Sequence, residues 1–156
     1  MNTSTAEETP SISTFSFERT TTIEEDMYVA NVDPAIGFTN GETYYIDNLR
    51  DLTTLRDLVN SGVDTTNITF ELTQNITVSK SSNWIPIGNA TNTFKGIFNG
   101  NGYTISNVTI STSDDNQGLF GCIENATIEN LGIINANITG GRSVGGIVAR
   151  ASNSRI

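Results

Sequence analysis

The sequence contains no histidine and only one cysteine in 156 residues. Imidazole is the commonest general base and metal ligand at neutral pH, so its absence argues against histidine-assisted nucleophiles and most metallohydrolases. The single cysteine, Cys122, cannot form a disulfide within the chain, and its neighbours Phe120 and Ile123 favour a buried thiol over a reactive one. We therefore expect no catalytic residue, no metal and no cofactor.

Positive charge is also scarce, since eight lysine and arginine residues stand against 17 acidic ones for a formal charge of -9. Phosphate backbones and anionic membranes bind clustered cations, so nucleic acid and membrane surfaces are disfavoured partners. No apolar run approaches the ~20 residues of a transmembrane helix. Residues 1–22 also lack the basic and apolar regions of a signal peptide, so no export signal is visible.

Hydroxyl and amide side chains take the place of charge: serine and threonine number 37 and asparagine 19. This balance is typical of extracellular β-rich proteins. Glycosylation sequons, Asn-x-Ser/Thr, occur at Asn2, Asn67, Asn75, Asn89, Asn107, Asn125 and Asn137. Seven is only slightly above the chance number for this composition, and we regard Asn67 and Asn89 as the candidate glycosylation sites.

The chain divides into three parts by composition. Residues 1–22 are rich in Thr, Ser and Glu and predict a disordered lead-in, and residues 23–62 predict an N-terminal extension with short strands and a capping helix. The helix is expected over 47–60, where apolar residues recur at three- and four-residue steps and Arg50, Asp51, Arg56 and Asp57 take the other face. Its proposed role is to cover the first layer of residues 63–156.

Residues 63–156 carry a repeated pattern. Gly96-Ile97-Phe98 returns as Gly118-Leu119-Phe120 and as Gly146-Ile147-Val148, at separations of 22 and 28 residues. Repeats of this length with alternating apolar positions predict a parallel β-solenoid whose coils stack about 4.8 Å apart. The pattern breaks off at Ile156, so we expect further coils, or a partner, to cover this end.

The alternation of apolar residues slips by one position twice, at Asn107 and at Asn130. The chain must bend at each slip, and an asparagine amide can satisfy the backbone groups that a bend leaves unpaired. We expect Asn107 and Asn130 to be structural corner residues at equivalent positions of neighbouring coils. Tyr103 and Ile105 are expected to point inward.

The residues from Trp84 to Gly88, from Phe94 to Ile105, from Gly118 to Gly121 and from Val144 to Val148 together resemble right-handed parallel β-helix surface proteins with GLUG-type repeats. The likeness covers about residues 46–156. Such proteins are adhesin-like or filamentous-haemagglutinin-like. The resemblance implies an extracellular or cell-surface location, with adhesion or scaffolding toward carbohydrate or protein partners in place of catalysis.

Two other readings remain open. The chain is alternatively the N-terminal part of a carbohydrate-active β-helix enzyme, a polysaccharide lyase or hydrolase, with its active site beyond Ile156; the nearest carboxylates are Glu71, Asp114, Asp115, Glu124 and Glu129. A structural spacer without a ligand is the third. The run 114–116 lacks the spaced ligands of a calcium loop, and we expect Trp84 to pack in the core, not to stack on sugars.

Overall fold

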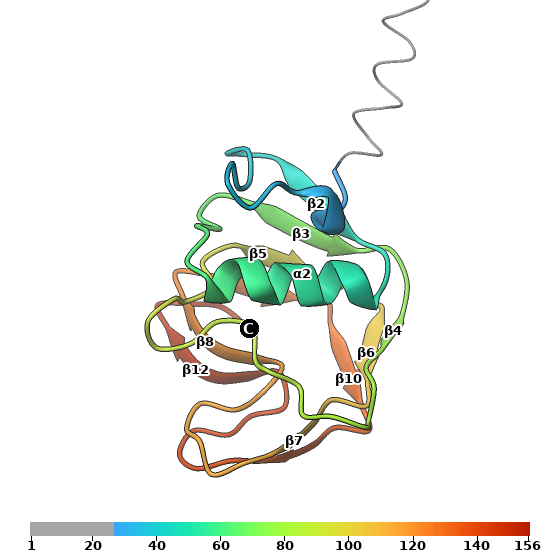
Figure 1. Cartoon of the computed structure of the whole chain (residues 1–156), viewed down its shortest axis with the longest axis vertical. Coiled ribbons are helices and arrows are strands. Elements are labelled where there is room, and N and C mark those ends of the chain that lie inside the picture. Colours follow the sequence, from blue (N-terminus) through green and yellow to red (C-terminus); the bar gives the residue numbers. More distant parts are fainter. Residues whose placement is uncertain (1–26) are drawn as a thin grey trace, which may run out of the picture.

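A computed structural model describes residues 27–156, and Figure 1 shows the arrangement. The lead-in predicted over 1–22 lies outside these residues. The described part consists mainly of short strands, with one α-helix, α2 (Leu49–Asn60), and one 3-10 helix, η2 (Val29–Asn31). This content belongs to the all-β class, as the sequence predicts. No helix in residues 27–156 is long and apolar enough to cross a membrane.

The strands form four parallel groups. The strands are β2 (Thr43–Ile46), β3 (Thr69–Leu72), β4 (Ile76–Thr77), β5 (Ile97–Asn99), β6 (Thr104–Ser106), β7 (Thr109–Ser111), β8 (Phe120–Glu124), β9 (Thr127–Glu129), β10 (Gly132–Ile134), β11 (Asn137–Thr139) and β12 (Val148–Ser152). Their order is β2-β3-β5-β9, β4-β6-β10, β7-β11 and β8-β12. Every pair of strands between 27 and 156 is parallel.

The chain builds these groups in successive layers, which we number along the sequence. The first layer is 43–60, the second 69–94, the third 97–124 and the fourth 127–152. Strands β9, β10, β11 and β12 of the fourth layer lie on β5, β6, β7 and β8 of the third, in that order. Ile105 pairs with Ile133 and Ile110 with Ile138, so these partners stand 28 residues apart.

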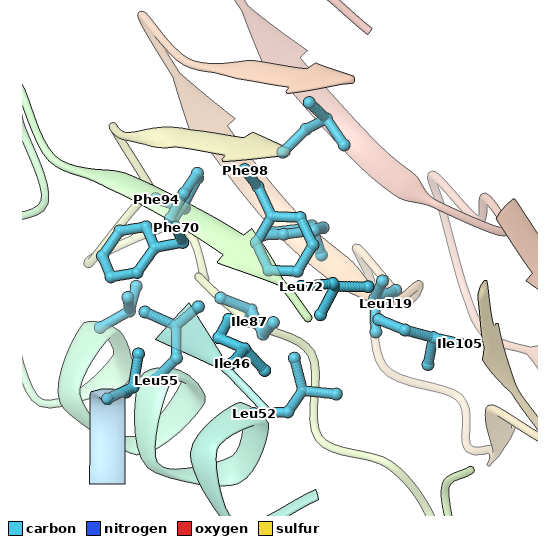
Figure 2. Packing of buried hydrophobic residues seen from close by; sticks show 14 of the residues in the cluster. Ile46, Leu52, Leu55, Phe70, Leu72, Ile87, Phe94, Phe98, Ile105 and Leu119 are labelled. Carbon is cyan, nitrogen blue, oxygen red and sulfur yellow. The ribbon is translucent and has the colours of Figure 1, made fainter. Parts of the chain in front are cut away.

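The core lies between the sheets, where apolar residues from every layer meet (Figure 2). Fully buried phenylalanines link the layers: the ring centroids of Phe70 and Phe94 are 5.7 Å apart, and the Phe120 ring lies 5.2 Å from both Phe94 and Phe98. Burying each such side chain stabilises the fold by roughly 1.5–3 kcal/mol. The period-two alternation in the sequence is thus the interior-exterior alternation of the strands.

Helix α2 forms where its apolar spacing predicts. Asn48 caps its first turn by accepting a hydrogen bond from the Asp51 backbone N–H at 3.0 Å. Leu52, Leu55, Leu58 and Val59 are buried. At the other end, the Asn60 side chain donates to the Pro86 carbonyl at 3.0 Å and accepts from the Gly88 N–H at 2.8 Å. The helix thereby satisfies backbone groups of the second layer.

The prediction that Asp51 lies on the polar face of the helix is wrong, because this side chain is 2% exposed. Its Oδ1 accepts a hydrogen bond from the Ala30 N–H at 2.8 Å, and its Oδ2 accepts one from the Asp47 N–H at 2.9 Å. The segment 27–31 folds over the start of the helix and takes it out of solvent. Asp51 therefore joins the extension to α2.

Two local predictions also differ from the structure. A strand was expected at Met27–Val29, but Tyr28 makes only an isolated parallel bridge with Tyr45, and η2 begins at Val29. Tyr103 is 37% exposed and does not point inward as Ile105 does. It follows the tight turn at Asn101 and Gly102, which both have positive φ, and this turn ends before the strand alternation of β6 begins.

Candidate functional site: a polar groove beside Trp84

A groove of about 320 Å³ lies on one side of the layers. One wall is the segment 83–90, with Asn60 at the end of α2, and the other wall is the loop 112–117, which leaves the third layer between β7 and β8. The lining residues are Asn60, Asn83, Trp84, Ile85, Pro86, Gly88, Asn89, Ala90, Ile110, Thr112, Asp114, Asp115, Asn116 and Gln117. The lining is thus rich in amides and includes no lysine or arginine.

Trp84 anchors the first wall. It is 3% exposed, its Nε1 donates to the Leu119 carbonyl at 3.0 Å, and the Arg56 guanidinium lies 5.0 Å from its ring centroid. The prediction that Trp84 packs in the core is confirmed, and it offers no stacking face to a sugar. Ile85, which follows it, is 58% exposed and presents the apolar surface of the groove.

The fourth layer holds the second wall in place. The Arg142 N–H donates to Asp115 Oδ1 at 2.6 Å, and the Gly141 N–H donates to the Asp114 carbonyl at 2.7 Å. Asn116 has a φ of 61° and donates its N–H to the Arg142 carbonyl at 2.8 Å. Four backbone or side-chain groups of one loop are therefore fixed by the next layer.

Several polar groups of the groove stay available after this network is formed. Among residues 27–156, neither the Asp114 carboxylate nor the Asn116 amide has a side-chain hydrogen-bond partner. The Asn89 Oδ1 accepts from the N–H groups of Thr91 and Asn92 at 3.0 and 2.8 Å, which leaves its Nδ2 as a donor. The groove therefore offers donors, acceptors and an apolar patch to a ligand.

The structure brings Asp114 and Asp115 to the groove but leaves the other predicted carboxylates elsewhere. Glu71 and Glu129 lie in the outer column of the sheet β2-β3-β5-β9 on either side of Asn99, and Glu129 is paired with Arg155 at 3.1 Å. Glu124 contacts the Thr93 hydroxyl at 3.5 Å. Within residues 27–156 no three acidic, cysteine or histidine side chains are grouped to hold a metal.

The corner asparagines lie at bends, with φ of 69° for Asn107 and 54° for Asn130. Their predicted equivalence is wrong. Asn107 lies between β6 and β7 and donates its N–H to the Ile134 carbonyl, beside Asn135, whereas Asn130 lies between β9 and β10 and donates its side chain to Asn99 Oδ1 at 3.1 Å. The strand register pairs positions 28 residues apart, not 23.

The two sequons proposed for glycosylation occupy different settings. Asn67 has a φ of 67° and its Nδ2 donates to Asn40 Oδ1 at 3.2 Å, so its amide is already engaged. Asn89 lies on the groove with its Nδ2 available. Sequence reasoning missed the groove itself, although the Ile85-Pro86 pair beside a buried tryptophan and the insertion between β7 and β8 mark its two walls.

Cys122 is 3% exposed, which confirms the buried thiol. Burial raises its pKa above the ordinary thiol value, and the nearby Arg150 opposes this shift only in part. The neutral thiol is therefore the favoured form in the folded protein.

Comparison with known proteins finds two similar segments. The chain is 36% identical over 118 residues to halomucin of Haloquadratum walsbyi, a match that covers 71% of this chain and 1% of that protein. It is 34% identical over 108 residues to a putative Gly-rich membrane protein of Evansella cellulosilytica, with 65% of this chain and 12% of that protein covered. The chain thus spans a small fraction of both relatives. No family model and no solved structure matches.

Proposed function

We propose that the chain is a segment of a right-handed parallel β-helix in a secreted or surface-exposed, adhesin-like protein. In this proposal it catalyses no reaction and presents polar faces and loops to carbohydrate or protein partners. The chain's similarity to a segment of a protein named as a membrane protein supports a surface or membrane location. The resemblance of residues 46–156 to GLUG-type repeat proteins supports the same reading.

The parallel register carries the proposal. Strands of successive layers pair in the same direction over all four groups, with apolar residues inside and Thr, Asn and Glu in the outward positions of the sheet β2-β3-β5-β9. Such stacking gives a long, rigid surface on which loops can be displayed. Adhesion and scaffolding need this surface and no reactive group.

The fourth layer supports a further part of the proposal, that more layers cover this end. Ile133, Ile138 and Val148 are only partly buried, whereas their partners Ile105, Ile110 and Phe120 in the third layer are at most 2% exposed. An apolar face with unpaired strand edges is the surface on which another parallel layer stacks.

The proposal is tested with the purified chain labelled and applied to a glycan array and to immobilised extracellular proteins. Specific binding that is lost after thermal unfolding is the expected result. Absence of binding on both surfaces would favour a structural spacer instead. Release of unsaturated or reducing sugar ends from any polysaccharide on incubation with the chain would contradict the non-enzymatic assignment.

A further inference from the structure

We infer that the groove between the segment 83–90 and the loop 112–117 binds a small neutral sugar. This inference rests on the proposed function and deepens it, because it assigns the binding activity to one site and one ligand class. The groove volume of about 320 Å³ lies at the lower end of the roughly 300–1,000 Å³ typical of small-molecule sites. It therefore suits one or two rings better than a peptide segment.

The available groups match the chemistry of a sugar. Each hydroxyl both donates and accepts, and the groove supplies the Asp114 carboxylate as an acceptor, the Asn89 Nδ2 as a donor and the Asn116 amide as both. Ile85, 58% exposed, provides the apolar surface against which the C–H face of a ring packs. A few fixed polar groups on an apolar wall are the usual composition of a ligand site.

The charges of the groove exclude acidic sugars. Asp114 and Asp115 both line it, no lysine or arginine is among its lining residues, and the whole chain carries a formal charge of -9. A uronate carboxylate would meet like charge with no cation to compensate it. A neutral or N-acetylated ring meets no such repulsion.

The walls are held before a ligand arrives. The hydrogen bonds from Arg142 and Gly141 fix the loop 112–117, and those from Thr91 and Asn92 fix Asn89. Little conformational entropy is then lost when a ligand binds, which compensates in part for the small contact area. Because the loop is tied to the fourth layer, the groove exists only when the third and fourth layers are stacked.

The test is a titration of the ¹⁵N-labelled full chain, followed by amide chemical shifts. The probes are the methyl glycosides of glucose, galactose, mannose and N-acetylglucosamine, with glucuronate and lysine amide for comparison. We expect at least one neutral glycoside to bind with millimolar affinity and to shift the amides of Asn89, Asp114 and Asn116. Glucuronate is expected to leave them unchanged.

Three variants remove single groups of the groove without removing a hydrogen bond of the fold: Ile85→Ala, Asp114→Ala and Asn116→Gly, the last of which keeps a residue suited to positive φ. Each is expected to weaken binding at least fivefold. The matched controls lie outside the groove: Ile36→Ala, at a side chain 80% exposed, and Glu42→Ala. They are expected to bind as the unchanged chain does.

The outcomes separate the site from the proposed function. Shifts that map outside the groove, or a stronger response to lysine amide than to any glycoside, would overturn the inference while leaving adhesion by another surface in place. No response to any glycoside, together with specific glycan-array binding, would do the same. Binding that the three groove variants lose and both controls retain would establish the site.

Discussion

Ile105 and Ile133 occupy the same column of the interior, one in the third layer and one in the fourth, and Ile76 of the second layer completes the column. Ile105 is fully buried, whereas Ile133 is only partly buried. Substitution of each by alanine removes the same atoms from two layers that differ in what covers them. We predict that Ile105→Ala destabilises the fold much more than Ile133→Ala.

The size of the difference follows from the burial. Replacing a buried isoleucine by alanine costs about 2–5 kcal/mol, a sum of lost transfer free energy and the free energy of the cavity left behind. Ile105 lies between two layers and both terms apply, so we expect about 3.5 kcal/mol. Ile133 leaves no closed cavity and loses only part of the transfer term, so we expect about 1.5 kcal/mol.

Urea unfolding followed by circular dichroism measures this difference. With an m value of about 2 kcal/mol/M, the two midpoints should differ by about 1 M. Ile36→Ala, at an exposed position, serves as the control and should change the free energy of unfolding by less than about 0.5 kcal/mol. Equal costs at Ile105 and Ile133, or a larger cost at Ile133, would refute the layered account of the core.

Three further predictions concern single residues. Gly88 and Gly102 share a φ of 83°, but a Cβ at Gly88 would lie 2.4 Å from the Cys122 carbonyl whereas nothing lies within 4 Å of one at Gly102; Gly88→Ala should therefore cost at least about 3 kcal/mol in thermal unfolding and Gly102→Ala about 1 kcal/mol. Asp51→Ala leaves two backbone N–H groups unpaired and should cost about 2–4 kcal/mol, while Asp51→Asn, which keeps one acceptor, should cost less; equal losses would contradict this role. Because burial raises the pKa of Cys122, the unfolded chain ionises first, and the free energy of unfolding should fall as the pH rises above about 8.5; Cys122→Ser should abolish this part of the fall, and an unchanged pH profile would contradict it.

Strand content, the helix and the interior could be predicted because each depends on local periodicity. The three- and four-residue spacing of leucines gives α2, and the alternation around Ile68, Phe70 and Leu72 gives β3. Buried residues are named by such patterns since the interior selects for apolar side chains regardless of which layer they meet. The buried positions of Trp84 and Cys122 follow from their apolar neighbours in the same way.

The register could not be predicted by matching glycines, because the loops differ in length between layers. Gly96 and Gly118 are not equivalent: Gly96 precedes β5, whereas Gly118 precedes β8. The 28-residue period was present in other residues, since Asn107 and Asn135, and Asn125 and Asn153, all have positive φ. The bends recur with the layers more faithfully than the glycines do.

The groove and the burial of Asp51 could not be predicted because both depend on contacts between segments far apart in the sequence. Asp51 is buried by residues 27–31, about 20 positions away, and the loop 112–117 is held by Arg142 and Gly141. Local polarity places such residues at the surface. Only the assembled layers show which polar groups are used within the fold and which are left for a ligand.

The most direct test of the account is a disulfide between neighbouring layers. Ser111 and Thr139 are exposed partners in β7 and β11, and parallel partners about 4.8 Å apart lie within the Cα range of a disulfide. In a Cys122→Ser background, Ser111→Cys with Thr139→Cys should oxidise with loss of both free thiols. Ser111→Cys with Asn137→Cys, shifted along the strand to about 8 Å, should not. Bridging of the shifted pair alone, or of neither pair, would contradict the parallel 28-residue register.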